Sequence, residues 1–302
     1  MFGFPPPSVI RSEIFAQLPE RYRSPGHGPR SPLRHSGAGT TLEGPSFDRL
    51  GNLYITDLAN SRIFRISPSG DCTFVAEYDG EPNGLKIHKD GRIFVADHRH
   101  GLMQLDPASG TMSLLCGGPE KERFKGINDL VVASNGDLYL TDQGGTGLHD
   151  PTGRVYRLRE NGELTCLIDT VPSPNGIVLD SSERVLYVAV TRANQVWNVP
   201  LTLSGGLTKV GVFVQLPCPA PDGLAMDLAE NLAVAAPGLG LVWVFDRFGL
   251  PIYRVEMPGG RHVTNLAYGG PDNRFLYMTE GDTYAVLRAE MPAAGRPMFS
   301  HQ

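Results

Sequence analysis

The sequence predicts an all-β protein, a six-bladed β-propeller with four antiparallel strands in each blade, and three observations support this prediction. Six times in the 302-residue chain a polar residue precedes a short apolar run. A second apolar run ends 14 or 15 residues after each such opening, and Asn-Gly, Asp-Gly or Ser-Gly turns separate many of the runs. Four strands with tight turns in a period of about 40 to 50 residues are typical of propeller blades.

Each period is marked at its beginning and again at the end of its second run. The openings are Glu43, Asn83, Asn128, Asn175, Asp222 and Asn265. The second runs end at Asp57, Asp97, Asp142, Val190, Ala236 and Glu280. Helical periodicity is nowhere sustained. We therefore expect residues 1–302 to form a single propeller domain.

The two ends of the chain must close the ring, because an open sheet edge invites aggregation. The sixth period supplies only three strand-like runs before the chain ends. Residues 9–18 resemble the fourth strand of a blade, so we expect them to complete blade six. Residues 19–42 do not fit the period and are rich in Gly, Pro, Ser and Arg. This segment is either a disordered surface loop or a partial lid over the rim where the six openings lie.

The composition excludes several classes of function. A net charge of −5 and a pI near 5.9 disfavour binding to nucleic acid. The chain has no apolar stretch of membrane-spanning length and no secretory signal pattern, so a cytoplasmic protein is expected and its oligomeric state is left open. Four cysteines are far apart and form no CxxC pair; we expect them to be buried and free: Cys72, Cys116, Cys166 and Cys218.

The six opening residues are expected to converge at one mouth of the central channel, because the first strand of each propeller blade lines that channel. Asn and Asp are also common turn residues, so any one position has a purely structural explanation. That explanation is weaker for Glu43, a poor turn former, and for Asn128, which Asp129 follows. Carboxylates and amides that converge in a tunnel are costly to desolvate unless a binding partner satisfies them. A set made only of oxygen ligands suits a hard divalent cation such as Ca²⁺.

Loops that follow the second strands are expected to hang over the same mouth. They carry cations, imidazoles and amides that either bind an oxygen-rich substrate or are solvated loop residues. Together with His262, which precedes the sixth inner strand, the loop candidates for substrate contact are His98, Arg99, His100, Gln143 and Arg192. Asn83 and Asp129, on the inner strands, complete the predicted substrate-binding set.

At these positions the chain resembles the senescence marker protein/gluconolactonase/luciferin-regenerating enzyme family. The resemblance runs from Leu42 to about Ala289 through EGPSFD, PNGLKIHKDGRIFVAD, INDLVVASNGDLYLTD, PSPNGIVLD and PDGLAMD. It implies a six-bladed propeller with one functional divalent metal, whose ligands fall on Glu43, Asn175 and Asp222. Asn128 matches a position that is a ligand in some members and a substrate contact in others. The chain is also similar to diisopropyl fluorophosphatase and to bacterial calcium-dependent lactonases.

The expected function is that of a metal-dependent lactonase acting on a small sugar-type lactone. A metal ion, Ca²⁺ before Zn²⁺, Mg²⁺ or Mn²⁺, would polarise the ester carbonyl and water would attack it. Asp222 would act as the general base or, alternatively, as the nucleophile. Two other functions stay open: a phosphotriesterase or fluorophosphatase at the same metal site, and a non-enzymatic calcium-binding propeller.

Overall fold

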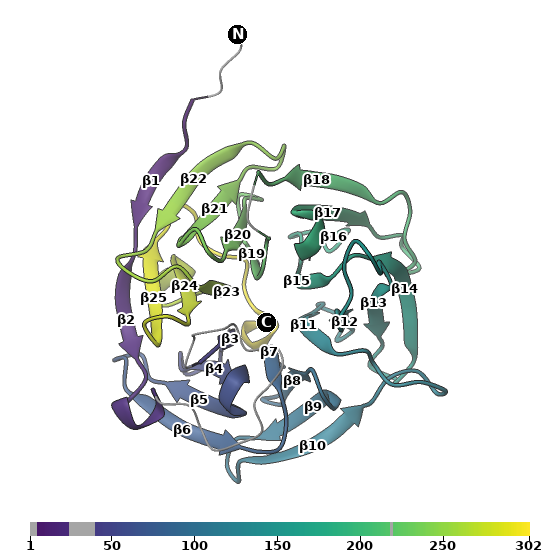
Figure 1. The fold of residues 1–302 in the computed structure, drawn as a ribbon, viewed down its shortest axis with the longest axis horizontal. Helices are drawn as coiled ribbons and strands as arrows, with labels where there is room; N and C mark the ends of the chain where they lie inside the picture. Colours follow the sequence, from purple (N-terminus) through teal and green to yellow (C-terminus); the bar gives the residue numbers. More distant parts are fainter. Residues whose placement is uncertain (1–4, 24–39, 218–219) are drawn as a thin grey trace.

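Six sheets surround a central axis in the computed structural model, which describes residues 5–23, 40–217 and 220–302 (Figure 1). The strands of each blade run from the axis outward, and neighbouring strands along the chain pair antiparallel. The six-bladed propeller predicted from the sequence is therefore confirmed.

The first three blades each consist of four strands that are consecutive in the chain. Blade one contains β3 (Leu42–Phe47), β4 (Leu53–Asp57), β5 (Arg62–Ile66) and β6 (Cys72–Glu77). Blade two contains β7 (Pro82–Ile87), β8 (Ile93–Asp97), β9 (Gly101–Asp106) and β10 (Thr111–Cys116). Blade three contains β11 (Ile127–Val132), β12 (Leu138–Asp142), β13 (Gly153–Leu158) and β14 (Leu164–Val171).

Blades four and five follow the same order, and the last blade is completed by the beginning of the chain. Blade four contains β15 (Pro174–Leu179), β16 (Val185–Val190), β17 (Gln195–Pro200) and β18 (Gly211–Gln215). Blade five contains β19 (Leu224–Met226), β20 (Leu232–Ala236), β21 (Leu241–Phe245) and β22 (Pro251–Glu256). Blade six contains β23 (Val263–Gly269), β24 (Phe275–Glu280), β25 (Ala285–Glu290) and β2 (Glu13–Gln17). Short 3₁₀ helices are η1 (Glu20–Tyr22), η2 (Leu58–Asn60), η3 (Thr191–Ala193), η4 (Pro271–Asn273) and η5 (Phe299–His301).

The N-terminal segment closes two blades, which corrects the expectation that residues 9–18 form one strand of blade six. Only β2 pairs with β25, antiparallel, to complete that blade. The preceding β1 (Ser8–Arg11) pairs parallel with β22 and adds a fifth strand to blade five. Ser12 joins the two, and its backbone N–H donates to Glu256 O at 3.0 Å. Because β1 and β2 pair with different sheets, the N-terminal segment covers the outer edges of blades five and six, whereas a single strand would cover only one edge.

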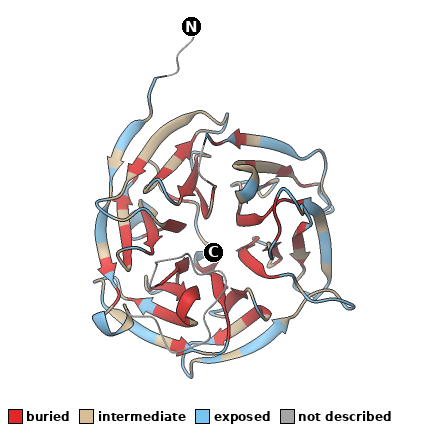
Figure 2. Ribbon diagram, in the orientation of Figure 1, coloured by how far each residue is buried: buried red, intermediate tan, exposed pale blue. Residues whose placement is uncertain are grey.

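Burial decreases from the axis to the outer strands (Figure 2). All residues of β8 and β12 are buried, whereas most residues of the outer strands β6 and β14 are exposed or half-buried. The cysteines on those outer strands are accordingly not buried as the sequence had suggested. Cys166 is exposed, and Cys72 and Cys116 of β10 are half-buried; all three are free thiols. Cys218 lies outside the described residues.

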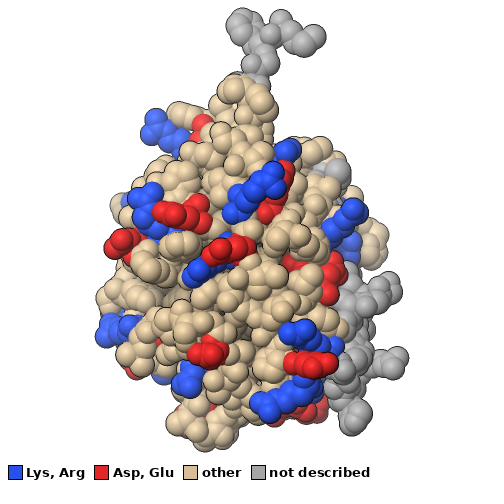
Figure 3. Space-filling view, turned by 90° about the vertical axis from the view of Figure 1, so that its left-hand side faces the viewer, with Lys and Arg blue, Asp and Glu red and all other residues tan. Residues whose placement is uncertain are grey.

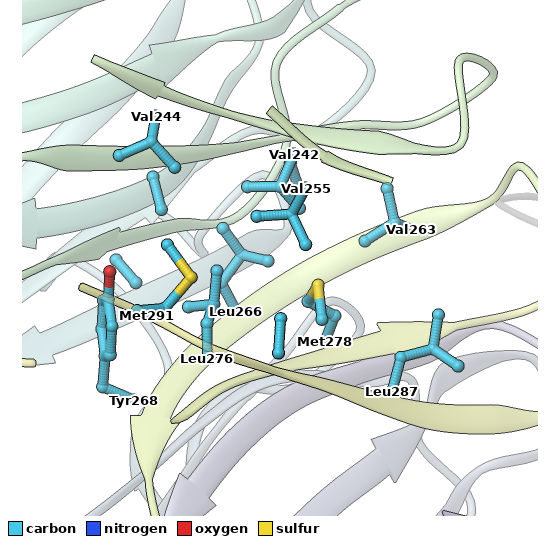
Figure 4. Packing of buried hydrophobic residues seen from close by; sticks show 14 of the residues in the cluster. Val242, Val244, Val255, Val263, Leu266, Tyr268, Leu276, Met278, Leu287 and Met291 are labelled. Carbon is cyan, nitrogen blue, oxygen red and sulfur yellow. The ribbon is translucent and has the colours of Figure 1, made fainter. Parts of the chain in front are cut away.

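Neighbouring blades are held together by apolar side chains packed between their sheets. Val242 and Val255 of blade five pack with Leu266, Met278 and other side chains of blade six (Figure 4). The same face-to-face packing recurs around the ring and orders the inner strands around one axis.

The C-terminal segment crosses the far mouth of the channel, and the C-terminus lies near the axis (Figure 1). Ser300 Oγ donates to the carbonyl oxygen of Phe47 at 2.7 Å. The Phe299 ring packs against His88 with a centroid distance of 4.7 Å. Arg296 is hydrogen-bonded to the carbonyl oxygen of Leu179 on β15. These contacts with blades one, two and four cover the axis on the side opposite the polar openings.

Acidic and basic residues alternate on the outer wall of blades five and six, as Figure 3 shows for one side of the molecule. Arg288 of β25, for example, pairs with Glu13 of β2 at 2.8 Å. None of the described helices is long and apolar enough to cross a membrane. The predicted rim lid of residues 19–42 falls largely on residues 24–39, which lie outside the described residues.

Candidate active site on the propeller axis

A β-bulge near the beginning of five inner strands places two consecutive residues of each strand at the channel. The strand pairing shifts between Glu43 and Ser46 of β3 and between Ile127 and Leu130 of β11, and β7, β15 and β23 show the same shift. A bulge puts two residues of one strand opposite one of its partner. The normal alternation of side chains is thereby suspended at the channel mouth.

The shared register corrects the sixth opening by one residue. Leu130 on β11 and Leu266 on β23 occupy equivalent places after the bulge, so Thr264 is equivalent to Asn128 and Asn265 to Asp129. The upper ring consists of Glu43, Asn83, Asn128, Asn175, Asp222 and Thr264. The first aliphatic residue after the opening was the signal that aligns the strands correctly: it stands two positions after the opening in four of the six periods but only one position after Asn265.

All six residues of this upper ring line one cavity of about 570 Å³ at the channel mouth. The cavity therefore joins the four predicted metal ligands, Glu43, Asn128, Asn175 and Asp222, and also Asn83. Four of the six loops that follow second strands contribute to its wall, whereas the loops at 97–101 and 281–283 do not. Gln143, Arg192 and His262, three of the predicted substrate contacts, belong to the wall. Leu58, Thr191, Pro237 and Gly238 lie in loops that were predicted over the mouth but were not singled out. Thr41, Ala220 and Thr264 were missed.

Two buried carboxyl groups in the ring have raised pKa values. Burial raises the pKa of Asp222 to about 7; the Asp129 carboxylate adds to this effect, and a hydrogen bond with Asn175 opposes it. Burial also raises the pKa of Glu43 well above its usual range, and repulsion from Asp222 contributes. Both groups would gain from a cation placed between them.

Amide oxygens beside these carboxyl groups lack hydrogen-bond partners. Asn128 Nδ2 donates to Gln143 Oε1 at 3.0 Å, and Gln143 Nε2 donates to Ser173 Oγ at 3.0 Å. This chain of hydrogen bonds orients the Asn128 amide and leaves its Oδ1 atom buried and unpartnered, as is Oδ1 of Asn83. Gln143 thus holds a ring residue in place, in addition to lining the cavity.

The residues one position further along the inner strands form a second, deeper layer. Four of the six are glycines, and the other two are Asp129 and Asn265. A Cβ atom on Gly84 would collide with Asp129 Oδ1, and one on Gly223 would lie 2.5 Å from Asn265 Oδ1. The glycines therefore leave the space that these two side chains fill. Asp129 is a component of this layer, and it does not line the cavity wall.

Arg99 and His100, in the loop after β8, contact residues of the loop between β6 and β7. Arg99 forms ion pairs with Asp79 and, at 3.5 Å, with Glu81. Nε2 of His100 lies 2.5 Å from the carbonyl oxygen of Asp79. Neither residue is among the described residues that line the cavity. Their assignment to substrate binding stays a prediction, and the structure does not bring them to the site.

His98 is also set back from the cavity. Its ring packs against Gly126, and its Nδ1 atom is buried without a hydrogen-bond partner. Burial lowers the pKa of His98, although the nearby carboxylates of Glu81 and Asp142 oppose the effect. The predicted substrate contact at His98 is therefore untested, and the geometry favours Arg192 and His262 over it.

The donor set of the upper ring fits a hard divalent cation. It offers two carboxylates and amide oxygens, two of which have no other partner. In the described part of the chain, no three His, Cys, Asp or Glu side chains form a metal-ligating group by themselves. An ion at this site would consequently depend on the amides Asn83, Asn128 and Asn175 as well as on Glu43 and Asp222.

The raised carboxyl pKa values predict how stability depends on pH. A carboxyl group whose pKa is higher in the folded state stabilises the fold below its unfolded-state pKa, and this contribution is lost as the pH rises through its folded-state value. In EDTA, the wild-type Tm should therefore fall relative to that of Asp222→Asn between about pH 4 and pH 8. Thermal unfolding of both proteins across this range measures the gap, and a gap independent of pH would contradict the prediction.

The fold and the cavity together define a class: six-bladed propellers with a concave polar site on the axis, of a size that suits a small molecule. The chain belongs to the SMP-30/gluconolactonase/LRE-like family, whose model matches residues 42–282. It is 31% identical over 246 residues to lactonase drp35 of Staphylococcus aureus, an alignment that covers 75% of this chain and 73% of that protein. It is 30% identical over 242 residues to lactonase drp35 of Staphylococcus epidermidis, with the same coverage.

Solved structures share the fold at lower sequence identity. A calcium-binding protein, regucalcin, from Agrobacterium tumefaciens superposes with a TM-score of 0.77 at 22% identity, covering 98% of this chain and 99% of that one. A gluconolactonase from Xanthomonas campestris superposes with a TM-score of 0.74 at 23% identity, covering 89% and 97%. The family relationship supports lactone hydrolysis, and these structures support the fold.

Proposed function

We propose that this protein is a divalent-metal-dependent lactonase that hydrolyses the ester bond of a small cyclic ester. The observation that carries the proposal is the axial cavity, in which Glu43 and Asp222 face unpartnered amide oxygens. The relatives named as lactonases support the same reaction class. A cavity of about 570 Å³ suits a substrate of the size of a sugar lactone.

Glu43, Asn128, Asn175 and Asp222 would hold the ion, and Asn83 adds a fifth oxygen at the same rim. Ca²⁺ suits this set best because it accepts many oxygen ligands in flexible geometry, and Mg²⁺, Mn²⁺ and Zn²⁺ remain alternatives for the titration below. When bound, such an ion supplies a Lewis acid for the ester carbonyl.

Asp222 is the residue proposed to handle the proton of the attacking water. Its carboxylate would accept that proton while the water oxygen bonds to the carbonyl carbon; the ring C–O bond then breaks, and the released alkoxide takes up a proton. Asn175 holds the carboxylate through its hydrogen bond. Direct attack by Asp222 is the alternative route. Transfer of ¹⁸O from labelled enzyme to product in a single turnover would distinguish nucleophilic attack from general-base catalysis.

Arg192 and His262 supply polar groups on the cavity wall for binding hydroxyl or carboxylate groups of the substrate. Gln143 acts indirectly, since its hydrogen bond sets the orientation of the Asn128 amide. The predicted small-molecule partner would enter from the rim, because the C-terminal segment covers the opposite mouth.

A substrate panel with metal control tests the function. The protein is freed of metal with EDTA and assayed on sugar lactones, aliphatic lactones and organophosphate triesters, with and without added Ca²⁺, Mg²⁺, Mn²⁺ or Zn²⁺. We expect lactone hydrolysis that disappears on chelation and returns with metal. Hydrolysis of the phosphotriesters alone would favour the fluorophosphatase alternative. Metal binding without any hydrolysis would favour a calcium-binding propeller, and lactonase activity that survives chelation would rule out the metal mechanism.

A further inference from the structure

Beneath the proposed metal ligands, the deeper layer holds a third buried carboxylate that the proposed reaction does not use. Asp129 has a side chain only 2% exposed. Its Oδ1 accepts the backbone N–H of Leu130 at 2.8 Å, and its Oδ2 lies 3.4 Å from Nδ2 of Asn265. Asn265 Nδ2 also donates to Glu43 Oε2 at 3.0 Å. Asn265 therefore connects the deeper carboxylate to the ring above it.

Among the described residues, the cationic partner of Asp129 is Lys86, on the neighbouring inner strand β7. Its Nζ atom lies 3.6 Å from Asp129 Oδ1, and its side chain is 18% exposed. Nζ also donates to the carbonyl oxygen of Leu85 at 3.2 Å. Lys86 borders a small apolar cavity of about 80 Å³ between the axis and the C-terminal segment. The ammonium thus approaches the axis from the far side, below the carboxylates.

The other basic residue at this small cavity is occupied elsewhere. Arg296 pairs with Glu183 and donates to the carbonyl oxygen of Leu179. Of the two basic residues at this cavity, Lys86 is thus the one whose charge acts on the axial carboxylates, from the side of the C-terminal segment. In their fully charged forms, the carboxylates of Glu43, Asp129 and Asp222 and the one ammonium of Lys86 have a net charge of −2, which a single divalent ion neutralises. Without Lys86 the same group would have a net charge of −3.

We propose that Lys86 is a built-in counter-ion, a positioning residue that neutralises Asp129 from below and so matches the axial site to one divalent cation. This inference rests on the proposed metal site in the ring above. It predicts that the charge of Lys86 weakens binding of the first ion, because the ammonium and the ion repel one another across the largely buried deeper layer. An ordinary structural ion pair would affect folding stability and leave metal affinity unchanged.

The test is calcium titration of the full-length, EDTA-stripped protein by isothermal calorimetry, with Lys86→Met, Lys86→Arg and Lys86→Met/Asp129→Asn. We expect one Ca²⁺ per wild-type chain. Lys86→Met should bind its first Ca²⁺ at least about tenfold more tightly, and Lys86→Arg should resemble the wild type. The double variant restores the net charge of −2 and should return the affinity to near the wild-type value. Lys89→Met is the matched control, since Lys89 lies over the ring of Phe299 on the outside.

Each outcome separates this inference from the proposed function. If the stripped wild type binds no divalent ion, the metal site itself is wrong. If the wild type binds Ca²⁺ and Lys86→Met binds it with unchanged or lower affinity, only the counter-ion role is wrong. Should Lys86→Met fail to fold without metal, Lys86→Arg and the double variant still decide the matter. A double variant whose affinity differs from the wild type by more than about tenfold would then overturn the charge-matching argument.

Discussion

Asp222→Asn is expected to lower kcat/KM for the best lactone substrate by about a thousandfold or more. The substitution keeps the shape of the side chain and removes both the proton acceptor and one of the two carboxylates of the ring. Calcium affinity should fall by at least about tenfold, because the remaining ring contains one carboxylate only. Steady-state kinetics at saturating Ca²⁺ and calorimetric titration measure the two effects separately.

The control for this prediction is Asp106→Asn, at the exposed C-terminal end of β9. It removes the same charge from the outside of blade two and should leave kcat/KM within about twofold of the wild type. A kcat/KM for Asp222→Asn within tenfold of the wild-type value would show that Asp222 is neither base nor essential ligand. The proton acceptor would then have to be sought among the wall residues, with His262 first.

Gly176→Ala is expected to destabilise the fold by about 1–3 kcal/mol or more and to impair the site at the same time. A Cβ atom at this position would collide with the carbonyl oxygen of Asp222 and lie 2.8 Å from Gly223 Cα and 2.9 Å from Leu224 N. All three are backbone atoms of the neighbouring inner strand or its entry, so no side chain can rotate away. The strand that carries Asp222 must move instead.

Urea unfolding measures the stability loss, and calcium titration of the folded variant measures the damage to the site. Gly259→Ala is a suitable control, because a Cβ atom there meets no atom within 4 Å. We expect the control to match the wild type within about 0.5 kcal/mol. If Gly176→Ala were as stable as the control and bound Ca²⁺ normally, the close contact between inner strands would not be a constraint.

The blade count and most strands could be predicted from the sequence because their signals are local. Alternating apolar residues and Asn-Gly or Asp-Gly turns specify a hairpin within about ten residues, and their repetition specifies the ring. Closure of the ring could not be read in the same way. The pairing of β1 with β22 joins residues more than 240 positions apart, and no local pattern distinguishes Val9, in blade five, from Ile14, in blade six.

The candidate site was predicted correctly in outline, but the sixth inner strand was aligned one residue out of register. Five of the six ring positions were identified, since each is the polar residue before an apolar run. The sixth ring position had been assigned to Asn265 and not to its neighbour Thr264. A bulge turns two consecutive residues inward, and only the strand pairing shows which of them is equivalent to Asn128. The sequence pattern could not show that Arg99 and His100 contact Asp79, because Asp79 belongs to another loop.

The sequence by itself determined the six-bladed fold and the kind of atoms that meet on the axis, because both depend on a repeated local pattern. Only the tertiary structure decided how those atoms are layered. The bulges separate an upper ring that contains Glu43 and Asp222 from a deeper layer that contains Asp129, and Lys86 reaches that layer from a neighbouring strand. Such contacts depend on the approach of strands in space, and the pattern along any one strand does not encode them.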